Sequence, residues 1–265
     1  MKINNILIVG DDGYNSIGTR LLVHLLKDRF NLKIAATKDQ QSGVGGKLTL
    51  VREVKWGREE VDGVEAIWVN GTPVDAIELA RNYFKEKFDL VISGMNLGAN
   101  ATNGIISSGT FAVAFRSFAL DMAPNILVLS WNCPDDFWCR QGDENDEFRK
   151  FLEYPGKACE KIIDVAVEND FWGSDMLNVN FPIQNSSKAV FTRIITKIPD
   201  FYDSSIEINE ETHSYVHPYG IVESKGDLNL DGDAIRAGYI SITPCRTDFL
   251  NDKVYEKLKG ESFEI

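Results

Sequence analysis

Two adjacent carboxylates stand where a short apolar run of the sequence ends. Residues 6–9 are aliphatic and typical of a buried parallel strand, and Asp11 and Asp12 follow after one glycine. Two like charges at the end of a core strand repel each other, so they favour a bound cation. Carboxylate oxygens are hard ligands that suit Mg²⁺ or Mn²⁺. The pair therefore suggests a divalent metal site, as in the receiver domains that hold Mg²⁺. A plain turn, with Asp12 capping the next helix, is the alternative.

A second motif, Ser-Ser-Gly-Thr at residues 107–110, opens an apolar helical pattern at 110–120. Hydroxyls and a glycine at a helix N-terminus offer backbone N–H groups and a positive dipole end to an anion. The alternative is an ordinary N-cap by Ser107 or Ser108. Asn96 adds an amide just after the apolar run 89–94. A cation site beside an anion site predicts chemistry on a phosphorylated substrate, whose charge a cation can neutralise.

The elements that position these residues alternate between strand and helix patterns. Strands are expected at 6–9, 32–37, 89–94, 125–131 and 176–182, helices at 17–26, 72–88, 110–120 and about 148–169, and a hairpin at 51–56 and 65–70. Thr72 and Pro73 have the types expected of an N-cap and a first helical position. This order predicts an α/β fold, a Rossmann-like three-layer α/β/α sandwich with a mostly parallel sheet. Its strands present their carboxyl ends to one ligand-binding edge.

The C-terminal part of the sequence has a different character. Strand-like segments at 191–197, 215–224 and 238–244 surround a short helical piece at 233–238. We therefore expect a Rossmann-like core with the metal site at residues 1–190. We expect a β-rich extension at 191–265 that packs on the core or on a neighbouring subunit. Residues 133–147 form an acidic insertion flanked by cysteines, which we expect at the surface.

The overall composition excludes several classes of protein. The 265 residues include 28 Lys and Arg and 40 Asp and Glu, a net charge of -12, which disfavours a nucleic-acid partner. The four cysteines have no zinc spacing and no disulfide framework, although a bridge between Cys133 and Cys139 stays open. The first apolar run is too short for a signal peptide, and no stretch approaches the roughly 20 apolar residues of a membrane span. We expect a cytoplasmic protein with no membrane association.

Several motifs together resemble the SurE family of survival-protein phosphatases. The matching segments, in the family's order, are Gly-Asp-Asp-Gly at 10–13, the loop around Ser42, Gly-Thr-Pro-Val-Asp at 71–75, Ser-Gly-Met-Asn-Leu-Gly-Ala-Asn at 93–100, Ser-Gly-Thr at 108–110, Leu-Asn-Val-Asn-Phe-Pro at 177–182 and Gly-Tyr-Ile-Ser-Ile-Thr-Pro at 238–244. They span most of the chain, and the resemblance rests on the set as a whole.

The resemblance implies a metal-dependent phosphomonoesterase that hydrolyses nucleoside 5′- or 3′-monophosphates. It implies one divalent cation per subunit, Mg²⁺ or Mn²⁺, and a homodimer or homotetramer that exchanges its C-terminal extension. The metal ligands would be Asp11, Asp12, Ser42 and Asn96, and Asp11, Asp12 and Asn96 would be catalytic. Asn100, Ser108, Gly109 and Thr110 would bind the substrate phosphate, apart from the metal ligands.

One position and one segment depart from the family pattern. Gly10 replaces the usual Asn before the aspartates, and residues 102–107 lack the usual Gly-x-Asp and the aromatic or His residue before Ser-Gly-Thr. These departures leave an alternative open, a nucleotide- or metal-binding protein of the same fold with weakened catalysis. Trp131 and Phe201 are aromatic candidates for stacking on a base, but no spacing selects either one.

Overall fold

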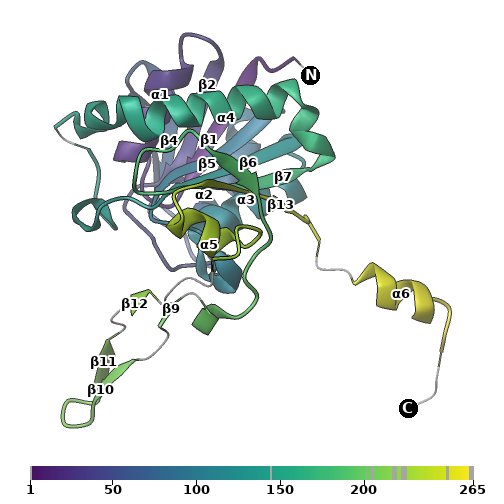
Figure 1. Ribbon diagram of the computed structural model, residues 1–265. Coiled ribbons are helices and arrows are strands. Elements are labelled where there is room, and N and C mark those ends of the chain that lie inside the picture. The colour runs from purple at the N-terminus through teal and green to yellow at the C-terminus, as the bar shows by residue number, and fades with distance from the viewer. Residues whose placement is uncertain are drawn as a thin grey trace.

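A nine-stranded sheet forms the centre of the protein in the computed structural model (Figure 1), which describes residues 2–143, 145–200, 202–203, 206–216, 220–221, 226–248 and 251–262. In sheet order the strands are β3 (Trp56–Val61), β4 (Val64–Val69), β2 (Asn31–Thr37), β1 (Asn5–Gly10), β5 (Leu90–Leu97), β6 (Asn125–Trp131), β7 (Met176–Phe181), β13 (Ile240–Cys245) and β8 (Ala189–Phe191). The six strands from β4 to β7 are parallel, while β3 and β13 run antiparallel to their neighbours β4 and β7. The expected mostly parallel sheet is confirmed.

Helices cover both faces of this sheet. Helices α1 (Ile17–Leu26) and α4 (Lys157–Glu168) lie on one face, and α2 (Pro73–Phe84) and α3 (Gly109–Ala119) lie on the other (Figure 1). Two separate apolar clusters result, one between the sheet and α1 and α4, the other between the sheet and α2 and α3. The three-layer α/β/α architecture is therefore confirmed.

The strand order reverses between β1 and β5. From β1 the chain continues to β2 on one side, whereas β5 is followed by β6 and β7 on the other. In open α/β sheets, ligands bind outside the carboxyl ends of the strands at such a switch point. Asp11 and Asp12 follow β1, and Asn96 lies near the end of β5, so all three belong to this point.

The helix caps show whether Asp12 is the N-cap of the helix that follows it. Thr72 caps α2 in a reciprocal capping box with Asp75, as expected. Helix α1 is capped by Ser16, whose hydroxyl accepts a hydrogen bond from the Thr19 amide. Asp12 therefore does not act as the cap, because the helix begins five residues after it.

The helix expected at about 148–169 is broken in two. Short helical turns at Glu147–Phe151 and Leu152–Gly156 precede α4, and Tyr154, inside the second turn, has an extended backbone with φ −150° and ψ 131°. Pro155 explains the break, because the residue before a proline is disfavoured in the helical conformation. The expected strand at 65–70 matches β4, but the one expected at 51–56 is wrong: β4 pairs instead with β3, which begins only at Trp56.

The C-terminal third contributes both to the sheet and to projections from the core. Helix α5 (Asp231–Arg236) packs against β13, and helix α6 (Asp252–Leu258) lies away from the core (Figure 1). We define the arm as the hairpin of β10 (Glu207–Asn209) and β11 (Ser214–Val216), which also projects. Further short elements are η1 (Thr102–Ser107), η2 (Asp135–Phe137), η5 (Asp170–Gly173), η6 (Ile198–Asp200), β9 (Tyr202–Asp203) and β12 (Gly220–Ile221).

The division of the chain at residue 190 stays a prediction. Strand β13, which comes from the second part, belongs to the main sheet. Every helix in the described part of the chain is too short or too polar to cross a lipid bilayer.

Candidate active site

Asp11 lies buried between the end of β1 and the start of α3. The Thr110 hydroxyl donates a hydrogen bond to Asp11 Oδ1. A Cβ atom on Gly109 would lie only 2.6 Å from Asp11 Oδ2, so glycine lets the helix approach the carboxylate closely. Burial raises the pKa of Asp11, although hydrogen bonds from Thr110 and from the Gly109 backbone oppose the increase. The N-terminus of α3 thus already faces one anion, the Asp11 carboxylate.

Asp12 is buried beside it with an incomplete set of hydrogen-bond donors. Its Oδ2 accepts a hydrogen bond of 2.8 Å from the Leu97 amide, while Oδ1 has no partner among the described residues. Burial, and then repulsion by the Asp11 charge, raise the pKa of Asp12 well above its ordinary value. A buried, unpartnered carboxylate oxygen beside a second carboxylate is the arrangement that a cation would stabilise. The residues present therefore fit a divalent metal ion.

Asn96 joins this cluster through Thr110. The Thr110 hydroxyl lies 2.9 Å from Asn96 Oδ1, and the Asn96 amide group donates to the Gly98 carbonyl at 2.8 Å. Among the described residues, no three His, Cys, Asp or Glu side chains group as a metal site. A cation here would therefore be held by two carboxylates together with amide and hydroxyl oxygens.

Ser42 lies at the rim of the cluster. It is exposed, and Gln40 donates a hydrogen bond to its hydroxyl. Gln40 also opposes the increase in the pKa of Asp12, and the backbone amide of the neighbouring Gln41 donates to the Asp11 carbonyl at 2.7 Å. The structure thus places the Ser42 segment next to the carboxylates, with Gln40 between them. The assignment of Ser42 as a metal ligand stays a prediction.

The residues expected to bind the substrate phosphate have different environments. Ser108 caps α3, with its hydroxyl accepting from the Phe111 amide at 3.0 Å. Thr110 points inward to Asp11, so it lies among the expected metal ligands rather than apart from them. Asn100 donates its side-chain amide to Ser130 at 3.0 Å. Their role in substrate binding stays a prediction.

The insertion at 133–147 lies against the site, which the sequence did not suggest. A Cβ atom on Gly98 would lie 2.9 Å from the indole of Trp138, and one on Gly142 would lie 3.8 Å from the Asn15 amide group. The Gln40 amide donates to the Gln141 side chain at 2.9 Å. These contacts join residues far apart in the chain, so no local pattern signals them.

Neither aromatic candidate for base stacking is supported. Trp131 is buried in the core, where it packs on Phe151 with ring centroids 4.8 Å apart, so it cannot meet a ligand. Phe201 lies outside the described residues. The four cysteines, Cys133 and Cys139 included, are unpaired in the structure.

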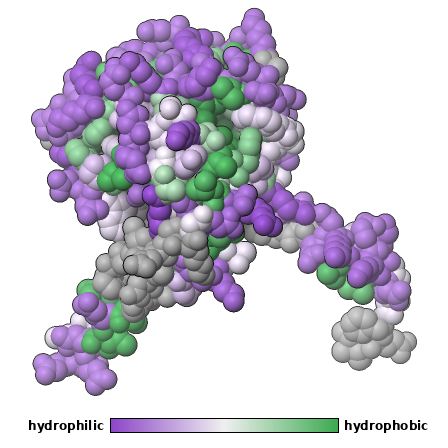
Figure 2. Space-filling view, in the orientation of Figure 1, coloured by the Kyte–Doolittle hydropathy of each residue, from purple (hydrophilic) through white to green (hydrophobic). Residues whose placement is uncertain are grey.

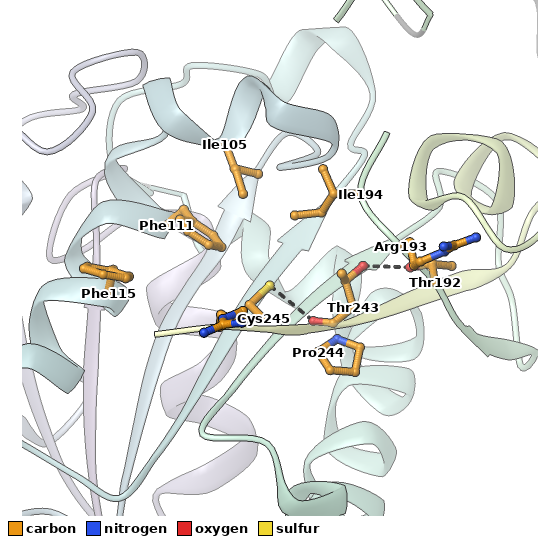
Figure 3. Close-up of a pocket in the computed structure, with 10 residues that line it drawn as sticks. Ile105, Phe111, Phe115, Thr192, Arg193, Ile194, Thr243, Pro244 and Cys245 are labelled. Carbon is orange, nitrogen blue, oxygen red and sulfur yellow. Dashed lines mark hydrogen bonds between the residues drawn. The ribbon is translucent and has the colours of Figure 1, made fainter. Parts of the chain in front are cut away.

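A cavity of about 280 Å³ lies elsewhere, between the outer face of α3 and β13 (Figure 3). Phe111 and Phe115 from α3 line one side, and Ile194 and Cys245 line the other. None of the predicted site residues lines it, so this cavity is distinct from the carboxylate cluster.

Comparisons with known proteins show what the chain is similar to. Residues 6–200 match the family model described as survival protein SurE. The chain is 27% identical over 260 residues to a protein named 5′-nucleotidase SurE from Archaeoglobus fulgidus, covering 96% of both chains. It is 29% identical over 266 residues to one of the same name from Thermoanaerobacter sp. strain X514, covering 98% of this chain and 99% of the relative. The crystal structure of the SurE protein from Aquifex aeolicus superposes with a TM-score of 0.73 and 26% identity, covering 96% of this chain and 98% of that one.

Proposed function

The chain belongs to the SurE family, and from this premise we propose that it is a metal-dependent nucleotidase that hydrolyses nucleoside 5′- or 3′-monophosphates to nucleoside and phosphate. The observation that carries the proposal is the buried Asp11–Asp12 pair with one unpartnered oxygen at the switch point of the sheet. Relatives that cover nearly the whole chain are named as 5′-nucleotidases, which supports the choice of substrate.

In this proposal Asp11, Asp12, Ser42 and Asn96 hold one divalent cation per subunit, Mg²⁺ or Mn²⁺. The bound cation would supply Lewis-acid activation of the phosphoryl group and of a water molecule. Hard oxygen ligands support these two cations over softer ones.

The chain's own groups position the reactants. The Thr110 hydroxyl orients Asp11 and Asn96 together. The second carboxylate, Asp12, is held by the Leu97 amide through one oxygen, which leaves its other oxygen to bind the cation. We assign Asn100 and residues 108–110 to the substrate phosphate, because the start of α3 is an electropositive helix end.

Assembly and location are also part of the proposal. We expect a homodimer or homotetramer in the cytoplasm. The exposed apolar side chains of the arm support association between subunits, and the four unpaired cysteines agree with a reducing compartment.

The test is phosphate release from a panel of 5′- and 3′-nucleoside monophosphates with Mn²⁺ or Mg²⁺. EDTA should abolish the release, and either cation should restore it. Full activity after exhaustive chelation would refute the role of the metal. Nucleotide binding without phosphate release would instead support the alternative, a binding protein with weakened catalysis, which Gly10 and the altered loop 102–107 motivate.

A further inference from the structure

The insertion at 133–147 crosses the loops that carry the carboxylate cluster. It contacts the loop after β1 at Asn15, the loop after β2 at Gln40, and the end of β5 at Gly98. At its beginning, burial and then the Asp12 charge raise the pKa of the Cys133 thiol to about 12, which agrees with a position close to the site. The insertion therefore forms a wall along the same edge of the sheet as the metal ligands.

The C-terminal half of this wall is held firmly against the first helix. Arg20 of α1 donates to the Asp143 carbonyl at 3.1 Å and forms an ion pair of 2.7 Å with Asp146. The buried Asp143 carboxylate in turn accepts hydrogen bonds from the amides of Glu147 and Phe148. Such charge-assisted contacts fix the C-terminal half of the insertion to the first helix.

The residues around Trp138 are fixed as well. Phe137 packs edge-on against the core residue Phe151, with ring centroids 5.0 Å apart. Arg140 stacks over Phe137 and forms an ion pair of 2.6 Å with Glu147. Trp138 thus projects from a segment that is anchored on both sides, and its position is set before any ligand arrives.

Trp138 lies directly beside the end of β5. Its pyrrole edge faces Gly98, whose carbonyl accepts the hydrogen bond from the Asn96 amide group. Gly98 has φ +138°, a conformation that favours glycine, and a side chain there would collide with the indole. Even so, 47% of Trp138 remains exposed. The exposed part of this aromatic side chain therefore lies beside Gly98, two residues after the proposed metal ligand Asn96.

We propose that Trp138 is a specificity-determining residue, whose indole stacks on the base of a bound nucleoside monophosphate while the phosphate lies at the carboxylate cluster. This inference rests on the proposed nucleotidase function. Stacking tolerates every base because each base has a π face, so Trp138 distinguishes nucleotides from phosphomonoesters without a base rather than one base from another.

The test compares AMP with glycerol 2-phosphate as substrates of the wild type, Trp138→Ala and Trp138→Phe. Trp138→Ala should lower kcat/KM for AMP by about 5- to 100-fold, the range expected for loss of one base–aromatic stack. The loss should come mainly from KM. Trp138→Phe should recover much of it, and activity on glycerol 2-phosphate should change little in either variant.

Trp172→Ala is the matched control. Trp172 has a similar exposure of 40%, but it precedes β7 at the opposite end of the strands and contacts Phe191 instead. This variant should keep wild-type kinetics on both substrates. Thermal melts of all three variants check that each one folds.

Equal losses on both substrates would overturn the proposal, because Trp138 would then only support the loop. Unchanged AMP kinetics in Trp138→Ala would overturn it too. If the wild type released no phosphate from either substrate, the proposed function would fail. The stacking of Trp138 on the base would then still be tested by intrinsic tryptophan fluorescence. Titration with AMP and Mn²⁺ should quench tryptophan emission in the wild type and in Trp172→Ala, but much less in Trp138→Phe. Equal quenching in all three proteins would refute stacking.

Discussion

Asp11 and Asp12 form a buried pair whose charges are poorly compensated without a cation. Burial raises the pKa of both carboxyl groups, and the Asp11 charge adds to the increase at Asp12. A raised pKa means that the ionised form is less stable in the folded state than in the unfolded chain. Near neutral pH the pair therefore opposes folding until a cation binds.

Replacing Asp11 with Asn removes one charge at nearly constant shape. We expect Asp11→Asn to be inactive, yet at least as stable as the parent in metal-free buffer. In our proposal Mn²⁺ binds the folded state alone, so a hundredfold excess over Kd should stabilise the parent by about 2.7 kcal/mol. The variant should gain much less.

Paired thermal melts with and without Mn²⁺, beside a phosphate-release assay, check the Asp11 prediction. If Asp11→Asn melted well below the parent without metal, the aspartate would be a structural residue of the turn. Retained activity would contradict its catalytic role.

Thr110 connects the helix start to the proposed metal ligands, because its hydroxyl contacts both Asp11 and Asn96. Thr110→Val keeps the shape but removes this donor, and hydrogen bonds to charged groups contribute about 1.5–3 kcal/mol. We expect Mn²⁺ affinity to fall at least about tenfold, as measured by calorimetry. Thr110→Ser should retain the affinity. Ser108→Ala, which removes only the cap, should leave it unchanged, and equal losses in all three variants would disprove a specific role.

The sequence led to part of this cluster for a physical reason. Asp11, Asp12 and Asn96 follow apolar runs, and the rule that parallel strands end at one edge brings them together. The contact between Thr110 and Asp11 joins residues 99 positions apart, and no local periodicity carries that information. The position of Trp138 was missed for the same reason.

At the scale of elements, Asp75 ties helix α2 to the loop that carries Ser42. Its carboxylate accepts hydrogen bonds from the Thr49 amide at 2.8 Å, the Thr49 hydroxyl at 2.7 Å and the Thr72 amide at 2.9 Å. Burial alone would raise the pKa of Asp75, but these hydrogen bonds outweigh it, and the pKa is lowered. The ionised carboxylate therefore stabilises the fold.

Because the folded-state pKa of Asp75 is lowered, its contribution is complete above the unfolded value of about 3.9 and is lost as the pH falls through the folded value. Asp75→Asn should lower the free energy of unfolding by about 1–3 kcal/mol at pH 7. The difference from wild type should shrink below about pH 4.

Urea unfolding from pH 7 downward measures the Asp75 effect. The exposed Asp121, which pairs with Lys87 at the surface, supplies the control Asp121→Asn, which should show no such trend. A pH-independent difference between Asp75→Asn and wild type would contradict the assigned cause.

Hydrophobic periodicity predicted most elements, and the capping residues predicted the start of α2. The break before α4 was missed even though Pro155 is visible in the sequence. The apolar spacing continues across the proline, so periodicity alone does not show that the helix has ended. Membership of β13 in the main sheet could not be predicted either, because strand pairing depends on contacts distant in the chain.

At the scale of the whole molecule, the arm is the feature that favours association with another subunit. A two-stranded hairpin alone is marginal in water, and this one exposes Ile208, Tyr215 and Val216 (Figure 2). We expect a homodimer or larger assembly at micromolar concentration, measured by light scattering. Ile208→Glu combined with Val216→Glu should shift it toward the monomer.

Ser214→Glu adds one negative charge at a polar position of the arm and should leave the assembly intact. A compact monomer in the wild type, with the arm present, would contradict the expectation.

The place of β13 in the sheet also bears on how the protein is made. Strand β7 is complete when Phe181 is synthesised, but its partner β13 is complete only at Cys245. At roughly 5–20 residues per second, translation leaves β7 without that neighbour for several seconds. During this interval a nascent chain presents an unpaired, apolar strand edge, the kind of surface that recruits chaperones or aggregates. A premature stop before residue 240 would make that edge permanent, although every proposed metal ligand would already be present.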